Sequence, residues 1–174
     1  AALADRGGAP VPVAVWPDFP PDAASSVVDL GTRHLTPDEA AARASTIRAS
    51  GRLAHKIDST LRGNWAAELA ARHGATGHTV LLVPALPALG RVCVGGLVTL
   101  GGRGVHEGPA GADARRSASG SRPADALRSL GVNVHELADM RSVSAWLRAP
   151  DGMAIADADD DATIDGIVDR WHRG

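Results

Sequence analysis

Aromatic residues and cysteine are scarce in this sequence. Its 174 residues include no Tyr, one Phe, four Trp and a single cysteine, Cys93. So few aromatic side chains argue against a surface that stacks the bases of single-stranded nucleic acid, and they leave the core to Ala, Val, Leu and Ile. One cysteine excludes an internal disulfide and a cysteine-rich zinc site.

The sequence also lacks a strong charge of either sign and a long apolar run. Its formal net charge is −2, so nothing in the overall charge points to nucleic acid or a membrane surface. No stretch is long and apolar enough to cross a bilayer, and no signal peptide is visible. These absences fit a reducing, cytoplasmic setting. The hydrophobic share of 44% and the charged share of 22% are ordinary for a soluble domain, and the length suits one domain.

Apolar runs typical of strands alternate with helical patterns along most of the chain. The strand candidates are residues 11–16, 26–30, 53–57, 79–83, 132–137 and 153–158. The helix candidates are residues 36–50, 64–73, 123–130, 141–148 and 163–171. This alternation predicts an α/β fold, with a mostly parallel sheet and helices on both faces in a Rossmann-like three-layer arrangement.

One region breaks the alternation. Residues 92–106 contain short apolar runs between glycine pairs, which predicts a hairpin-like insertion. Residues 107–123 are rich in Gly, Ala, Ser and Arg and have no periodic pattern, which predicts a mobile loop. We expect residues 1–174 to form one α/β domain.

The most informative polar stretch follows the strand candidate at residues 53–57. It holds Lys56, Asp58, Ser59, Thr60, Arg62, Gly63 and Asn64. Ligands of open α/β sheets bind at the carboxyl ends of strands, and the start of the following helix favours an anion. Arg can bind a carboxylate or phosphate through two hydrogen bonds, and Asp58 could orient a hydroxyl or accept its proton. The stretch therefore indicates a small, anionic, polyhydroxylated ligand, although the residue types alone also fit an ordinary helix start with solvated cations.

Two more cations follow strand candidates. Arg33 comes after residues 26–30, and Arg91 comes after residues 79–83. In a parallel sheet both would lie at the same edge as the polar stretch, where a cluster of cations could hold a carboxylate. Separate, solvated surface cations are the alternative.

Metal and nucleotide motifs are missing. The acidic run from Asp157 to Asp161 does not match a calcium loop, because Ala162 and Val168 stand where Gly and Glu are required, so capping of the last helix explains it better and we expect no metal site. The sequence contains no Gly-Lys-Ser/Thr loop and no Gly-x-Gly-x-x-Gly before a helix. Ser59 does not lie in a Gly-x-Ser-x-Gly motif, which argues against a serine hydrolase.

Three sequence blocks resemble the four-carbon acid sugar kinase family. Residues 56–64 (KIDSTLRGN), followed by Glu68 and Leu69, resemble the signature of that family. Residues 84–91 (PALPALGR) resemble its second block, with Leu86 where Phe is usual. Residues 28–35 (VDLGTRHL) resemble a third, with Gly31 where a second polar residue is common. The resemblance covers nearly the whole chain but only the amino-terminal domain of the family.

The resemblance implies the substrate-binding domain of a kinase. Such an enzyme would transfer the γ-phosphoryl group of ATP to a hydroxyl of a four-carbon sugar acid of the threonate, erythronate or 3-oxo-tetronate type. It implies that Lys56 and Arg62 hold the carboxylate, with help from Arg91 and Arg33. The substrate hydroxyls would contact Asp58, Ser59, Thr60 and Asn64, with Gly63 in the same loop. Asp58 is the best candidate in the chain for a catalytic base.

The family also implies parts that we expect this chain to lack. ATP and Mg²⁺ would belong to a carboxy-terminal nucleotide-binding domain, so we expect neither to bind this chain, which would be inactive alone. Family members carry a strand and an Asp-Asp-x-Thr-Gly loop before this point, and the chain begins without Met, so we expect it to be trimmed at the N-terminus. The chain could also form a homodimer.

Two other interpretations fit the sequence. One is a stand-alone sugar-acid binding or regulatory module without catalysis. The other is a nucleotide-independent enzyme of the sugar-acid isomerase type, with Asp58 as base.

Overall fold

The computed structural model describes residues 13–16, 26–47, 53–113, 117–118 and 120–173. Its central sheet is parallel and has three strands in the order β3-β8-β7. These strands are β3 (Val80–Leu82), β7 (Val134–Leu137) and β8 (Met153–Ala156). Met153 of the middle strand pairs with the first residue of each neighbour.

Two smaller sheets accompany the central one. β1 (Val13–Val15) and β2 (Val27–Asp29) form a parallel pair. β4 (Arg91–Val94), β5 (Leu97–Leu100) and β6 (Arg103–Gly104) form an antiparallel sheet. The hairpin-like insertion predicted for residues 92–106 is therefore confirmed.

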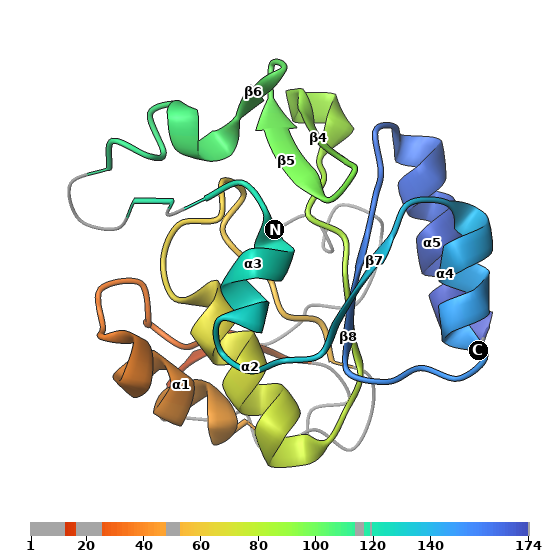
Figure 1. Cartoon of the computed structure of the whole chain (residues 1–174). Helices are drawn as coiled ribbons and strands as arrows, with labels where there is room; N and C mark the ends of the chain where they lie inside the picture. Colours follow the sequence, from red (N-terminus) through yellow and green to blue (C-terminus); the bar gives the residue numbers. More distant parts are fainter. Residues whose placement is uncertain (1–12, 17–25, 48–52, 114–116, 119, 174) are drawn as a thin grey trace.

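Five α-helices are described, and they are α1 (Pro37–Ser45), α2 (Trp65–Thr76), α3 (Pro123–Arg128), α4 (Met140–Leu147) and α5 (Asp161–Arg173). Two short 3-10 helices, η2 (Pro87–Leu89) and η3 (Val105–Glu107), flank the antiparallel sheet. α2 and α3 lie on one side of β7 and β8, and α4 and α5 lie on the other (Figure 1). The predicted α/β arrangement with helices on both faces is confirmed.

Local sequence explains where two of the helices begin. Thr36 caps α1, and Glu39 returns the bond to the Thr36 backbone, with Pro37 at the first helical position. This is the capping box expected from the sequence. Asp139 caps α4 by accepting a hydrogen bond from the Ser142 backbone at 2.7 Å.

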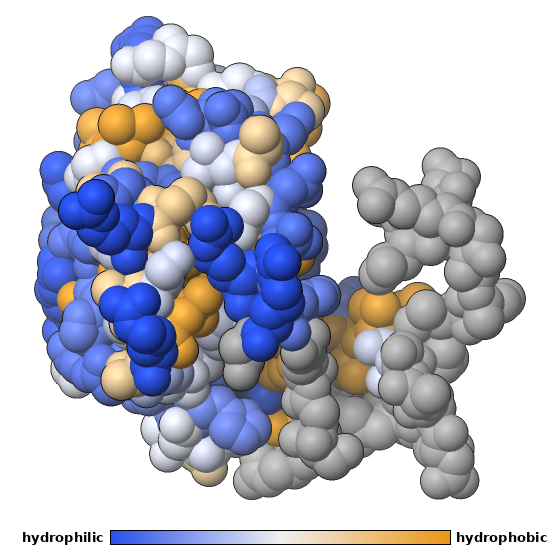
Figure 2. Space-filling view, turned by 90° about the vertical axis from the view of Figure 1, so that its right-hand side faces the viewer, coloured by the Kyte–Doolittle hydropathy of each residue, from blue (hydrophilic) through white to orange (hydrophobic). Residues whose placement is uncertain are grey.

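The core divides into two clusters across β8, which is buried along its whole length. Met153 and Ile155 pack in the cluster formed with α2 and α3, whereas Ala154 and Ala156 pack in the cluster formed with α4 and α5. This alternation follows from the two-residue period of a strand, and an apolar run is typical of a parallel strand that is buried on both faces. On the side that faces solvent, α4 and α5 present mainly hydrophilic residues (Figure 2).

One predicted strand is absent. Residues 53–57 are described, but they form no strand, so the parallel strands divide into two sheets instead of one. One apolar residue of this segment, Ile57, instead packs against the larger core cluster. Residues 11–12 and 48–50, and part of the predicted mobile loop at 107–123, lie outside the described residues. The mobility of that loop stays a prediction.

Within the described part of the chain, no helix is both long and apolar enough to cross a membrane.

Candidate functional site

The polar stretch at residues 56–64 forms a tight loop that Asp58 organises. The Oδ2 atom of Asp58 accepts hydrogen bonds from the Thr60 backbone at 3.0 Å, the Thr60 hydroxyl at 2.8 Å and the Arg62 backbone at 3.3 Å. Leu61 adopts a φ of 60° and Gly63 a φ of 81°. A positive φ is natural for Gly but strained for Leu, so the side-chain bonds of Asp58 hold a backbone shape that the chain would otherwise avoid.

Asp58 also forms an ion pair with Arg62 through two parallel contacts. Arg62 donates from Nε to Oδ2 at 3.0 Å and from Nη2 to Oδ1 at 3.1 Å. Burial acts to raise the pKa of Asp58, but the hydrogen bonds from Arg62 and Thr60 outweigh it and hold that pKa well below its usual range. A carboxylate so strongly stabilised is a weak proton acceptor. The geometry thus favours Asp58 as a residue that positions Arg62, while its predicted role as base stays a prediction.

Buried polar contacts join this loop to the block at residues 28–35. The side-chain amide of Asn64 donates to the carbonyls of Thr32 at 2.8 Å and Leu35 at 2.9 Å. Nearby, Nε2 of His55 lies 2.9 Å from Oε2 of Glu68. Both amide hydrogens of Asn64 are engaged by the protein, so its side chain holds two loops together and has no hydrogen left for a ligand.

A large cleft opens beside the loop. Its volume is about 890 Å³, and it is lined by residues 53–59, by residues 78–86, which include β3, and by side chains of α2 and α5, among others. Four of the predicted site residues lie along it, namely Lys56, Asp58, Ser59 and Arg91. Most of the remaining lining is apolar. A cavity of this size with a few convergent polar groups is typical of small-molecule sites.

Arg91 is the strongest sign of a ligand in this cleft. Only 8% of the residue is exposed, and its side chain donates no hydrogen bond to a described residue. Burial lowers the pKa of Arg91, and the negative charge of Asp58 acts in the opposite direction. By contrast, the guanidinium of Arg72, which is also buried, donates to the carbonyls of Ala44 and Ile47. Among the described residues, no fully buried side-chain nitrogen lacks a hydrogen-bond partner, so the guanidinium nitrogens of Arg91 are accessible from the cleft that the residue lines. There they can donate to an anion bound in the cleft.

A smaller cavity lies against the other residues of the loop. Its volume is about 330 Å³, and Thr60, Arg62, Arg103 and residues 104–105 and 108–110 are among those that line it. The structure therefore divides the predicted site, with Lys56, Asp58, Ser59 and Arg91 at the large cleft and Thr60 and Arg62 at the small one.

Gly63, Asn64 and Arg33 line neither cavity. Gly63 shapes the loop and Asn64 ties it down. Arg33 lies near Arg62, because its Nη2 atom is 4.0 Å from Asp113, an acidic residue that Arg62 also contacts. Lys56 is exposed and donates to the carbonyl of Ile57 at 3.0 Å.

The acidic run has structural roles. Asp160 accepts a hydrogen bond from the Thr163 backbone at 2.6 Å, which agrees with the predicted capping of the last helix. Asp157 accepts from the backbones of Gly95 at 2.6 Å and Gly96 at 3.0 Å, and so holds the β4–β5 turn. Among the described residues, no group of three His, Cys, Asp or Glu side chains is arranged to bind a metal ion.

Sequence reasoning missed two contacts in this region. Asp113 lies in the segment without periodic pattern, and nothing in the sequence indicated that it contacts Arg62. The pair of His55 and Glu68 was also missed, although Glu68 stands four residues after Asn64 in the first turn of α2, where a buried carboxylate needs a partner.

Comparison with known proteins identifies the family. The family model of the sugar-binding N-terminal domain matches residues 2–173. A D-threonate kinase of Cupriavidus necator is 44% identical over 84 residues, which cover 45% of this chain and 20% of that protein.

Solved structures share the fold. A Bordetella bronchiseptica protein, crystallised as a domain-swapped dimer with bound citrate, has 26% identity and a TM-score of 0.72 over 92% of this chain and 45% of its own. A Haemophilus influenzae protein has 16% identity and a TM-score of 0.72 over 92% of this chain and 51% of its own. The chain thus spans about half the length of the solved relatives, and the stretch that matches the curated kinase covers a fifth of that protein. The match of the family model over almost the entire sequence shows that this chain belongs to the sugar-binding N-terminal domains of the four-carbon acid sugar kinases.

Proposed function

We propose that this chain is the substrate-binding domain of an ATP-dependent kinase that phosphorylates a four-carbon sugar acid of the threonate, erythronate or 3-oxo-tetronate type. The D-threonate kinase relative supports this substrate class. The citrate bound to the Bordetella protein supports a small carboxylate ligand, and its domain-swapped dimer supports a homodimer.

The guanidinium of Arg91, which faces the cleft and donates no hydrogen bond to a described residue, carries the proposal. It lies on the same cleft as Lys56, so two positive charges face one space. Asp58 also faces this space, but its charge is balanced by the two contacts from Arg62. The polar end of the cleft is therefore net positive, and a carboxylate bound between Arg91 and Lys56 would supply the missing partner.

The hydroxyl groups of the acid have partners at the same end of the cleft. Ser59 offers a hydroxyl, and Oδ1 of Asp58 accepts a single described hydrogen bond, from Arg62. A carboxylate oxygen can accept further bonds, so Oδ1 can bind a substrate hydroxyl without losing the ion pair. In this arrangement Asp58 selects for a hydroxylated acid over a plain one.

ATP and Mg²⁺ do not fit the residues described here. These residues include no glycine-rich phosphate loop before a helix and no cluster of three metal-binding side chains. We therefore assign both groups to a C-terminal nucleotide-binding domain of the complete enzyme. Phosphoryl transfer depends mainly on positioning and electrostatics, so the role of this domain is to hold the acid in a fixed orientation.

The alternative of a nucleotide-independent isomerase is less well supported. That reaction needs a base. Burial acts to raise the pKa of Asp58, but the hydrogen bonds from Arg62 and Thr60 outweigh it and hold that pKa well below its usual range. Asp58 is therefore a weak proton acceptor.

Calorimetric titration of the chain with stereoisomers of threonate, erythronate and 3-oxo-tetronate tests the proposal. We expect saturable binding of one of them, weakened at least about 10-fold in Arg91→Gln, because a charge-assisted hydrogen bond is lost. Arg148→Gln is the matched control, since Arg148 is exposed at the end of α4. Equal affinity in wild type and Arg91→Gln, or no binding of any acid by the folded chain, would contradict the proposal.

A further inference from the structure

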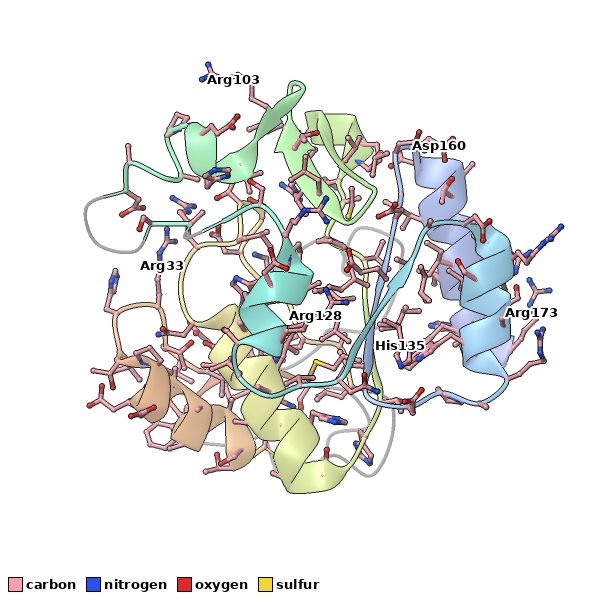
Figure 3. All side chains as sticks on the ribbon, viewed as in Figure 1. Arg33, Arg103, Arg128, His135, Asp160 and Arg173 are labelled. Atoms are coloured by element: carbon pink, nitrogen blue, oxygen red, sulfur yellow. The ribbon has the colours of Figure 1, made fainter. Side chains whose placement is uncertain are left out.

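Two arginines from different loops converge on one carboxylate. Nη1 of Arg62 donates to Oδ2 of Asp113 at 3.1 Å, and Nη2 of Arg33 lies 4.0 Å from the same oxygen. In Figure 3, Arg33 extends from the loop after β2 toward the segment that precedes α3. The side chains of Arg62 and Asp113 are about three-quarters buried, whereas that of Arg33 is half exposed.

Asp113 contacts the guanidinium nitrogen of Arg62 that does not contact Asp58. Nε and Nη2 of Arg62 are taken by Asp58, so Nη1 is the donor directed away from that pair. Arg33 adds a second positive charge 4.0 Å from the same carboxylate oxygen. Oriented donors from two arginines are the usual way to bind an oxyanion, whether carboxylate or phosphate.

This cluster is separate from the end of the large cleft where Arg91 lies. Arg62 lines the small cavity with Thr60, whereas Arg91 lines the large one. Asp58 connects the two, because it pairs with Arg62 and its charge acts on Arg91. The loop at residues 58–62 thus separates two positions for negatively charged groups.

We propose that Arg33 and Arg62 form a phosphate-binding position that the carboxylate of Asp113 fills in this structure. The assignment to phosphate rests on the proposed function, because a phosphorylated sugar acid carries two oxyanions and its carboxylate already has a place at Arg91. Asp113 then competes with the phosphate group and limits its affinity. Residue 113 is therefore an affinity-determining residue, and binding of phosphate exchanges one ion pair for another.

Binding of inorganic phosphate, measured by calorimetry at pH 7.5, tests this inference. We expect Asp113→Asn to bind phosphate about 5-fold more tightly than wild type, because a competing and repelling carboxylate is removed. Asp125→Asn removes an equal charge from the exposed side of α3 and should change the affinity less than 2-fold. Combining Asp113→Asn with Arg33→Gln should abolish the gain.

Several results would overturn the inference. Unchanged affinity in both Asp113→Asn and Asp113→Ala would mean that Asp113 only tethers its loop. An equal gain in Asp125→Asn would show a general charge effect. No phosphate binding by any of these folded chains would mean that the two arginines do not form such a position.

The sugar-acid titration separates this inference from the proposed function. If D-threonate binding depends on Arg91 but the phosphate affinity does not change in Asp113→Asn, the inference fails and the proposed function stands. If Asp113→Asn binds phosphate more tightly but no sugar acid binds, the proposed function fails. The two arginines then form an oxyanion position without an assigned substrate.

Discussion

At the scale of single residues, two ionisable groups that line the same cleft have opposite surroundings. Asp58 accepts hydrogen bonds from Arg62 and Thr60, whereas Arg91 is only 8% exposed and its side chain donates no hydrogen bond to a described residue. The first arrangement stabilises a loop, and the second favours a ligand. Because their partners differ, Asp58 has a structural role and Arg91 is available to a ligand.

The replacement Asp58→Asn tests the structural role of the Asp58 carboxylate. Its side chain is 21% exposed, so we expect a loss of about 1–2 kcal/mol in unfolding free energy at pH 7. The folded-state pKa of Asp58 lies below its unfolded value of about 3.9, so this contribution is complete above about pH 5 and is lost as pH falls toward the folded-state pKa.

Urea unfolding of wild type and Asp58→Asn at pH 7 and at pH 3 measures this difference, with Asp125→Asn as the exposed control. A stability gap that stays constant or widens at pH 3 would show that the carboxylate contributes nothing through its charge.

At the scale of elements, the loop at residues 58–64 and helix α2 form one unit with the block at residues 28–35. Asn64 provides the link through two backbone carbonyls. Gly63 adopts a φ of 81° just before the helix begins. The loop thus contains two residues with a positive φ, Gly63 and Leu61, and only the first of them is a glycine.

Two glycine replacements around α2 should have opposite effects on stability. A Cβ at Gly63 or at Gly74 would meet no atom within 4 Å, so neither replacement creates a clash. Gly63→Ala should destabilise the fold by about 1 kcal/mol because φ is positive there. Gly74→Ala should stabilise it by about 0.5–1 kcal/mol, since Gly74 lies inside the helix.

Thermal or urea unfolding of the two variants beside wild type measures the effects. A gain of stability in Gly63→Ala would mean that the backbone at residue 63 is not left-handed in solution, and a loss in Gly74→Ala would contradict the gain expected inside the helix.

Most elements could be predicted from local pattern, but part of the site could not. The apolar run at residues 153–158 and the capping box at Thr36 gave β8 and α1 correctly, because burial and capping are encoded in neighbouring residues. Residues 53–57 were predicted as a strand and form none, because strand pairing depends on a partner elsewhere in the chain. Asp113 was missed for the same reason, since its contact with Arg62 spans 51 residues.

At the scale of the whole molecule, the sheet with helices on both faces supports two cavities on either side of one loop. The large cleft carries a buried arginine, and the small one lies beside an arginine pair that is closed by Asp113. The solved relatives are about twice as long as this chain.

A crystal structure of this chain with D-threonate tests the central claim most directly. The proposed function predicts the acid in the large cleft, with its carboxylate about 3 Å from the guanidinium of Arg91 and a hydroxyl near Asp58. An acid seated in the small cavity against Arg62, or a large cleft that stays without acid at saturating concentration, would contradict the assignment of the carboxylate to Arg91.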